Sequence, residues 1–197
     1  MAGECGLLRF ILHLPTISKS GKFVLKDLPG SGQRIDVLCR SLAACFDWGP
    51  TIWPRMNLEI VALIEDDTSL RFVNPGQNLP RGEVAWASVI QASLTGSAPD
   101  YVGVERLSLK DIVIRELGRE NSALWALEET GTPLLETNRI DPSAQNSFII
   151  GNHRGFDSDT LKIFDDHSIY RLSLGRISYL TSHCVVGLLS HLEEMIH

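Results

Sequence analysis

The 197-residue sequence is poor in cysteine and has no long apolar run. Its four cysteines include no C-x-x-C pair, so no disulfide framework is indicated. No apolar stretch approaches the roughly 20 residues that a membrane-spanning helix needs. No basic leader precedes the first apolar run, so a secretory signal is not expected either. These absences predict a protein of a reducing compartment, the cytoplasm.

The sequence also lacks an excess of positive charge. The formal net charge is −6, whereas nucleic-acid-binding proteins usually carry a basic surface. The charge is unevenly distributed, because residues 1–60 carry +2 and the remaining residues carry −8. We therefore expect weak long-range attraction of a polyanion, and we expect any RNA to bind at a local basic patch near the amino terminus.

Apolar segments of strand and helix length alternate along the chain. The composition, 44% hydrophobic and 21% charged, is that of a globular protein, and we expect residues 1–197 to form one domain. The alternation predicts an α/β fold with a largely parallel sheet and helices on both faces. The expected strands cover 7–14 (interrupted by Arg9 and His13), 23–25, 58–64, 101–104, 123–127, 147–150 and 169–172. The expected helices cover 33–47, 83–94, 109–118, 157–166 and 179–196, and the segments 65–82 and 128–141 are expected to be turn-rich.

Two strand-like runs near the carboxyl terminus stop at a glycine. The run Phe148–Ile150 breaks at Gly151, and the run Leu172–Leu174 breaks at Gly175 before a long amphipathic segment. Backbone groups become free where a strand ends, and two such ends side by side form a nucleotide-like pocket in open parallel sheets. The alternative is two ordinary strand-to-helix turns.

A third pattern lies near the amino terminus. The turn Pro29–Gly32 precedes the expected helix 33–47, whose apolar stripe runs from Ile35 to Phe46. Arg34 lies outside this stripe, at a helix start where free amides favour a phosphate. We interpret Arg34 as an RNA contact; the alternative is an arginine that binds only water.

These three patterns together resemble a known family. Residues 23–40 resemble the opening motif of the TrmY-type pseudouridine N1-methyltransferases, and 151–156 and 173–184 resemble the family's two cofactor loops. The family belongs to the SPOUT class of S-adenosylmethionine-dependent RNA methyltransferases. The motifs stand in the family's order and span nearly the whole chain. The resemblance implies a deep carboxy-terminal trefoil knot, a homodimer, and methylation of N1 of a pseudouridine in RNA, tRNA in particular.

The resemblance also implies which residues bind S-adenosylmethionine. They lie at or just after expected strand ends and in the last helix: Leu127, Gly151, Leu172, Leu174, Gly175 and Cys184. In one place the chain departs from the family, which carries an aspartate where this sequence has Asn152.

The same resemblance implies a substrate site in the opening motif, with Arg34 and Arg40 binding RNA and Asp27 or Asp36 as the general base. A carboxylate that accepts the N1 proton typically accelerates such a reaction 10²–10⁴-fold. Two structural alternatives remain open. Asp36 also has the spacing of a surface ion pair with Arg40, and Asp27 precedes Pro29 as a turn-capping residue does.

Other chemistries fit the sequence less well. His153, His183 and Cys184 match no zinc-ligand spacing, and methyl transfer from a sulfonium needs no metal, so we expect no metal site. Ser182 with His183 lacks a G-x-S-x-G context, which argues against a hydrolase. The rival hypothesis is a non-catalytic RNA- or cofactor-binding protein that retains the SPOUT fold, which Asn152 and the acidic surface favour.

The oligomeric state can also be predicted. The small residues Val37, Ser41 and Ala44 share one face of the expected helix 33–47, and Gly187 interrupts the last helix. Together with the family resemblance, these features predict that the two helices meet at a two-fold interface.

Overall fold

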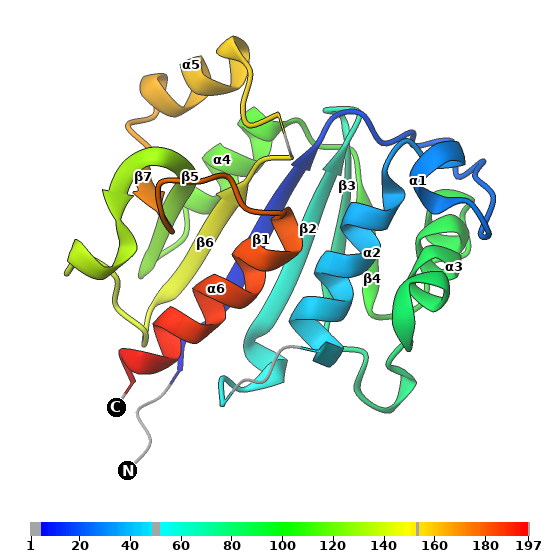
Figure 1. The fold of residues 1–197 in the computed structure, drawn as a ribbon, viewed down its shortest axis with the longest axis horizontal. Coiled ribbons are helices and arrows are strands. Elements are labelled where there is room, and N and C mark those ends of the chain that lie inside the picture. Colours follow the sequence, from blue (N-terminus) through cyan, green and yellow to red (C-terminus); the bar gives the residue numbers. More distant parts are fainter. Residues whose placement is uncertain (1–4, 49–51, 153, 197) are drawn as a thin grey trace.

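The fold is built on one seven-stranded sheet with the strand order β4-β3-β2-β1-β6-β5-β7 (Figure 1). The computed structural model describes residues 5–48, 52–152 and 154–196. The strands are β1 (Leu8–Leu14), β2 (Leu58–Ile64), β3 (Thr68–Val73), β4 (Val102–Glu105), β5 (Ser122–Pro133), β6 (Gln145–Ile150) and β7 (Tyr170–Ser173). The α-helices are α1 (Leu28–Ser31), α2 (Ile35–Ala43), α3 (Gly82–Leu94), α4 (Leu109–Leu117), α5 (Ser158–Asp166) and α6 (Thr181–Glu194). Short 3-10 or π turns are η1 (Ala44–Trp48), η2 (Arg55–Asn57), η3 (Gly76–Asn78) and η4 (Leu134–Glu136).

Parallel pairing dominates the sheet. β1 pairs in parallel with β2 and β6, and β5 pairs in parallel with β6 and β7. Only β3 and β4, at one edge, pair antiparallel with their neighbours. β1 and β2 are buried along their whole length, which is why each appears in the sequence as a nearly continuous apolar run. The predicted α/β fold with a largely parallel sheet is confirmed.

Helices cover both faces of this sheet, as predicted. α2, α3 and α6 pack on one face, against side chains such as Phe10 and Phe148. α4 and α5 pack on the other face, against side chains such as Ile11 and Ile149. Successive side chains of a strand point to opposite faces, so neighbouring residues of β1 and β6 contribute to two different cores. Figure 1 shows α6 and α2 side by side in front of the central strands.

The first third of the chain differs from the expected elements. Residues 23–25, expected as a strand, form no strand. Instead, the side-chain amide of Gln91 in α3 donates hydrogen bonds of 2.9 and 3.0 Å to the carbonyls of Gly21 and Phe23. A helix side chain therefore satisfies this backbone, and the strand prediction is wrong. The structure also contains a strand that was not expected. β3 lies in the segment 65–82, which was predicted to be turn-rich.

The helix expected over 33–47 begins two residues late. Gln33 and Arg34 have φ angles of 50° and 73°, in the left-handed region, so α2 begins at Ile35. The helix then widens into the π turn η1 at its carboxyl end. Among the described helices, none has the length and apolar character needed to cross a membrane. Cys39, Cys45 and Cys184 are buried and form no disulfide.

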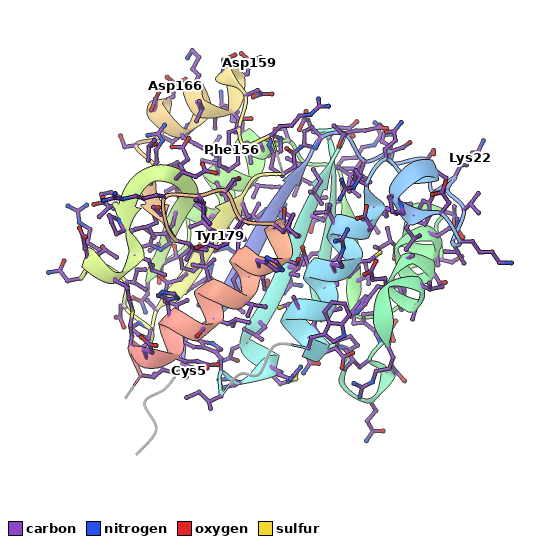
Figure 2. The ribbon with its side chains drawn as sticks, viewed as in Figure 1. Cys5, Lys22, Phe156, Asp159, Asp166 and Tyr179 are labelled. Carbon is purple, nitrogen blue, oxygen red and sulfur yellow. The ribbon has the colours of Figure 1, made fainter. Side chains whose placement is uncertain are left out.

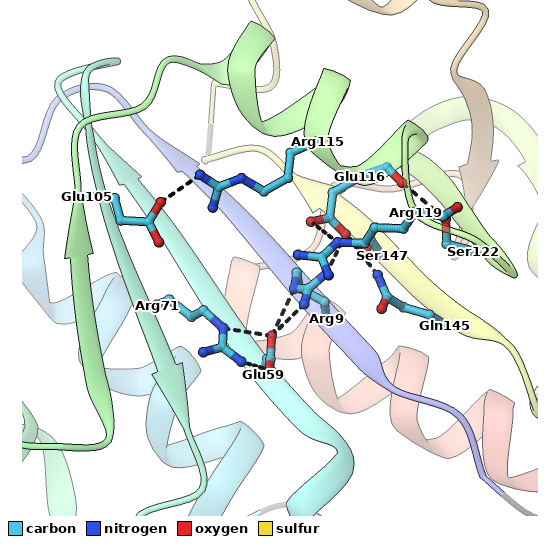
Figure 3. Close-up of polar contacts among 10 residues, drawn as sticks. All are labelled: Arg9, Glu59, Arg71, Glu105, Arg115, Glu116, Arg119, Ser122, Gln145 and Ser147. Carbon is cyan, nitrogen blue, oxygen red and sulfur yellow. Dashed lines mark hydrogen bonds and ion pairs between the residues drawn. The ribbon is translucent and has the colours of Figure 1, made fainter.

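A charged network crosses the core at the amino-terminal end of β1 (Figure 3). Arg9 has a side chain only 2% exposed, and it pairs with Glu59 of β2 and with Glu116 of α4. Glu59 also binds Arg71, and Glu116 accepts hydrogen bonds from Arg119, Gln145 and Ser147. The network satisfies the arginine that interrupts the apolar run of β1, and it joins β1, β2, β3, β6 and α4.

Candidate active site

A cleft with an empty volume of about 560 Å³, open solvent included, lies at the carboxyl ends of β6 and β7 and beside residues 127–129 of β5. It is lined by the ends of these strands and by the segment that leads into α6: Leu127, Glu128, Glu129, Ile150, Gly151, Asn152, Gly155, Phe156, Leu174, Gly175, Ile177, Ser178, Tyr179 and Cys184. Figure 2 labels Phe156, at the end nearest α5, and Tyr179, in the segment before α6.

The turn after β6 forms one wall. The carbonyl of Asn152 accepts a hydrogen bond from the amide of Gly155 (3.0 Å), and its side-chain oxygen accepts one from the amide of Arg154 (2.8 Å). A Cβ atom on Gly151 would lie 3.2 Å from the backbone of Gly155 and 3.3 Å from the ring of Phe156. Glycine at 151 therefore lets this turn fold back tightly, and Asn152 closes it.

The segment after β7 forms the opposite wall. The hydroxyl of Ser173 accepts a hydrogen bond from the amide of Gly175 (3.0 Å) and donates one to its carbonyl (2.7 Å). The hydroxyl of Thr181, the first residue of α6, donates a 3.1 Å hydrogen bond to the carbonyl of Gly151. The two glycine-ended strands predicted to share a pocket therefore do so, and α6 ties them together.

The third wall is an interruption in the pairing of β5 with β7. Leu127 and Thr132 both pair with Leu172, so residues 128–131 leave the ladder between them. A Cβ atom on Gly131 would lie 2.7 Å from the backbone of Leu172, and only glycine fits where the excursion returns to the ladder. The excursion brings Glu128 and Glu129 to the cleft.

Cys184 closes the cleft from α6. It is 9% exposed, and burial, aided by the negative charge of Glu129, raises the pKa of its thiol to about 11. The thiol is therefore neutral near pH 7. A neutral, largely buried thiol acts as an apolar wall and not as a nucleophile.

The structure brings together five of the six predicted cofactor residues. Leu127, Gly151, Leu174, Gly175 and Cys184 line the cleft. Leu172 is fully buried within β7 and does not line the cleft. The sequence reasoning missed the two glutamates, although their position directly after Leu127 at the expected strand end was a usable signal.

Three of the four predicted substrate-site residues, Arg34, Asp36 and Arg40, form a separate cluster. Asp36, whose side chain is 2% exposed, accepts two hydrogen bonds from Arg34 (3.0 and 3.1 Å) and also pairs with Arg40. Asp27 is exposed and caps the short helix α1, accepting a 3.2 Å hydrogen bond from the amide of Gly30. The capping role of Asp27, foreseen as an alternative, is therefore present. Asp36 does pair with Arg40, but its carboxylate is buried and not on the surface as that alternative supposed. Neither these carboxylates nor the two arginines line the cleft of the same chain.

A metal centre finds no support in the described part of the chain, where no group of three or more histidine, cysteine or acidic side chains is placed to hold an ion. His153, considered above with His183 and Cys184, lies outside the described residues.

The chain shares its α/β fold with solved methyltransferase structures. It is similar to Nep1 of Archaeoglobus fulgidus, solved bound to S-adenosylhomocysteine, with a TM-score of 0.59 and 16% identity over 96% of this chain and 98% of that one. It is also similar to ribosomal RNA small subunit methyltransferase E of Neisseria gonorrhoeae, solved bound to S-adenosyl methionine. There the TM-score is 0.50, with 14% identity over 98% of this chain and 68% of the other. At these identities the likeness concerns the fold.

The sequence comparisons define the family. Residues 7–196 match the family described as "Putative SAM-dependent RNA methyltransferase". The chain is 30% identical to tRNA (pseudouridine(54)-N(1))-methyltransferase of Thermococcus gammatolerans over 203 residues, 94% of this chain and 96% of that protein. It is 28% identical to the enzyme of the same name from Natronomonas pharaonis, over 86% of this chain and 87% of that protein. The chain belongs to this family of S-adenosylmethionine-dependent RNA methyltransferases. The family, enzyme class and cofactor predicted from the sequence are thereby confirmed.

Proposed function

We propose that this protein transfers the methyl group of S-adenosylmethionine to N1 of a pseudouridine in tRNA, at position 54, the nucleotide named for its relatives. The observation that carries this proposal is the cleft beside β5, β6 and β7, which is lined by the two segments that resemble the family's cofactor loops. We further propose that it works in the cytoplasm as a single-domain protein.

The cleft fits the cofactor chemically. Leu127, Ile150 and Leu174 offer an apolar slot for adenine, and the close turn at Gly151 lets the backbone approach the ligand. Leu172 is buried and does not line this slot. When bound, S-adenosylmethionine supplies an electrophilic methyl group on a positively charged sulfur. The two glutamates of the lining match that charge, and no anionic cofactor would be favoured beside them.

The cluster of Arg34, Asp36 and Arg40 is our candidate for RNA binding. The two guanidinium groups converge on one buried carboxylate, which fixes their orientation and leaves other N–H donors free to bind phosphate. Because Asp36 is buried and doubly paired, we assign it first to positioning these arginines. It remains, with Asp27, our candidate for accepting the N1 proton.

Replacing Arg34 should separate RNA binding from cofactor binding. The side chain is 45% exposed and lines no part of the cleft, so Arg34→Ala should leave the affinity for S-adenosylmethionine nearly unchanged. Arg40 still pairs with the buried Asp36, so the protein should remain folded. The affinity for tRNA should fall, and the slope of log K against log salt should become shallower by about one phosphate contact. Filter binding at several salt concentrations measures both quantities.

Arg115→Ala is the matched control for this test. Arg115 is 42% exposed, much as Arg34 is, but its partner Glu105 is itself exposed, and it belongs to α4 on the other face of the sheet. It therefore controls for the loss of one exposed positive charge. It should not change the salt slope. If Arg34→Ala reduces thermal stability or cofactor affinity and leaves the tRNA affinity and salt slope intact, Arg34 is structural.

We also propose a two-fold homodimer built on α2 and α6. The segment entering α6 exposes apolar side chains, Ile177 at 66%, Tyr179 at 43% and Leu180 at 48%, and Val186 follows on the helix at 37%. The arginine cluster does not line its own chain's cleft, so a second copy is needed to bring one cluster to the other cleft. Gly187 lies against its own chain, since a Cβ atom there would contact Leu174 at 3.5 Å. We therefore do not rest the dimer proposal on this glycine.

Light scattering at micromolar concentration tests this assembly. We expect the mass of two chains, about twice 21.8 kDa. A mass of one chain, unchanged by added S-adenosylmethionine, would rule the dimer out.

The carboxy-terminal trefoil knot is a further part of this proposal. After β7, at the edge of the sheet, the chain returns across the ends of β5 and β6, and α6 packs against α2 (Figure 1). The hydrogen bond from Thr181 to Gly151 holds the returning segment against β6. This return path supports a threaded chain end.

Methyl transfer can be tested directly. Purified protein and radiolabelled S-adenosylmethionine should label a tRNA that carries pseudouridine at position 54 and should not label the same tRNA with uridine there. If the protein binds S-adenosylmethionine and tRNA but methylates neither of these two tRNA substrates, the non-catalytic alternative is favoured.

A further inference from the structure

The lining of the cleft is acidic. It includes two carboxylates, Glu128 and Glu129, and none of its residues in the described part of the chain is a lysine, arginine or histidine. Asn152, on the facing wall, is neutral, and its side chain is used within its own turn. The charge that a ligand meets in the cleft is therefore set by the two glutamates.

The two glutamates differ in their partners. Glu128 lies 2.6 Å from the Nε atom of Arg171, and Arg171 is held a second time by Asp165 at 2.7 Å. Glu129 is exposed and has neither a hydrogen-bond nor an ion-pair partner among the residues that the structure describes. Its charge reaches across the cleft, because it contributes to the raised pKa of the Cys184 thiol. Glu129 is thus the one unneutralised carboxylate of the described lining.

The backbone around Glu129 is built to hold it there. Residues 128–131 leave the β5–β7 ladder between two residues that pair with the same partner, Leu172, so the excursion is short and anchored at both ends. Gly131 is required by the close approach to the backbone of Leu172. The side chain of Glu129 is therefore presented to the cleft from a constrained loop and not from a free one.

We propose that Glu129 is a specificity residue that makes the cleft prefer S-adenosylmethionine over its product, S-adenosylhomocysteine. This inference rests on the proposed function. The amino-acid end of both ligands is a zwitterion of net charge zero, so their net charges differ only by the sulfonium. An unpaired carboxylate in a partly enclosed cleft attracts the charged ligand and gains nothing from the neutral one. Methyl transfer removes the sulfonium charge, so the affinity for the product S-adenosylhomocysteine is lower than the affinity for S-adenosylmethionine.

Calorimetric titration of both ligands tests this assignment. In Glu129→Gln the affinity for S-adenosylmethionine should fall by about five- to tenfold, because two opposite charges about 4 Å apart interact by about 1 kcal/mol in water and Glu129 is exposed to solvent. The affinity for S-adenosylhomocysteine should change by less than about twofold. The affinity for S-adenosylmethionine divided by that for S-adenosylhomocysteine should therefore fall. A merely structural role of Glu129 would not alter this ratio.

Glu136→Gln is the matched control, because it removes the same charge from an exposed residue that does not line the cleft. It should leave the ratio unchanged, and thermal melting should show both variants folded. An unchanged ratio in Glu129→Gln, or an equal loss of affinity for both ligands, overturns the inference while leaving the proposed function intact. Failure of the unaltered protein to bind either ligand overturns the cofactor assignment itself.

Discussion

Gly151→Val is expected to abolish S-adenosylmethionine binding, with a loss of affinity of about 100-fold or more. A Cβ atom at 151 lies 3.2 Å from the backbone of Gly155 and 3.3 Å from the ring of Phe156, and valine adds two methyl groups beyond it. Gly155 and Phe156 both line the cleft, so the turn cannot accept valine without displacing a wall of the binding site. A 100-fold loss corresponds to about 2.7 kcal/mol, within the range that overpacking a tight site costs. Calorimetric titration measures the affinity.

Gly103→Val is the matched control for this substitution. Gly103 also lies in a strand, but its nearest neighbour to an added Cβ atom is the Cβ of Arg71 at 3.9 Å, so valine has room there. This variant should bind S-adenosylmethionine normally. If Gly151→Val, shown to be folded by its melting curve, also bound the ligand normally, the site would not be in this cleft.

The cleft was largely predictable because it depends on local features. A parallel strand that ends at a glycine is visible in sequence, and Gly151 and Gly175 both end strands of the predicted type. That these two ends meet follows from the parallel pairing of β5 with both β6 and β7. Local pattern and regular topology together therefore indicated where this cleft lies.

The third wall depends on a feature that local pattern does not encode. Residues 128–131 resemble an ordinary turn in sequence, whereas in the fold β5 continues beyond them to Pro133. The excursion exists because Leu127 and Thr132 both pair with Leu172, a residue about 40 positions later in the chain. The pairing register of β5 with β7 therefore determines that Glu128 and Glu129 line the cleft.

The opening motif shows a similar limit. Its residues were expected to start a helix at Gln33, with Arg34 projecting from the first turn. The left-handed φ angles of Gln33 and Arg34 instead turn the chain back, so that Arg34 bonds to Asp36, two residues later. Propensity alone does not favour such angles at non-glycine residues. In the structure, the left-handed conformation of Arg34 occurs together with its ion pair to the buried carboxylate of Asp36.

Arg9→Met is expected to destabilise the fold by about 3–5 kcal/mol, the typical effect of removing one partner from a buried ion pair. Methionine fills a similar volume but leaves Glu59 and Glu116 without the charge that lies between them. Glu59 keeps Arg71 and Glu116 keeps Arg119, but the side chains of these arginines are 47% and 38% exposed, so they compensate less than the buried one. Urea denaturation of both proteins measures the difference in free energy of unfolding.

The pH dependence of this loss identifies its cause. Burial alone would raise the pKa of Glu59, but hydrogen bonds from Arg71 and the charge of Arg9 outweigh it and hold this pKa below its ordinary value of 4.5. A lowered pKa stabilises the fold above pH 4.5, and that contribution is lost as the pH falls through the folded-state pKa. Without Arg9 the pKa of Glu59 rises, so Arg9→Met should begin to lose stability at a higher pH than the unaltered protein. Arg115→Met, which breaks the exposed pair with Glu105, should cost at most about 1 kcal/mol. If both variants lost the same small amount, the buried network would contribute no more than a surface ion pair.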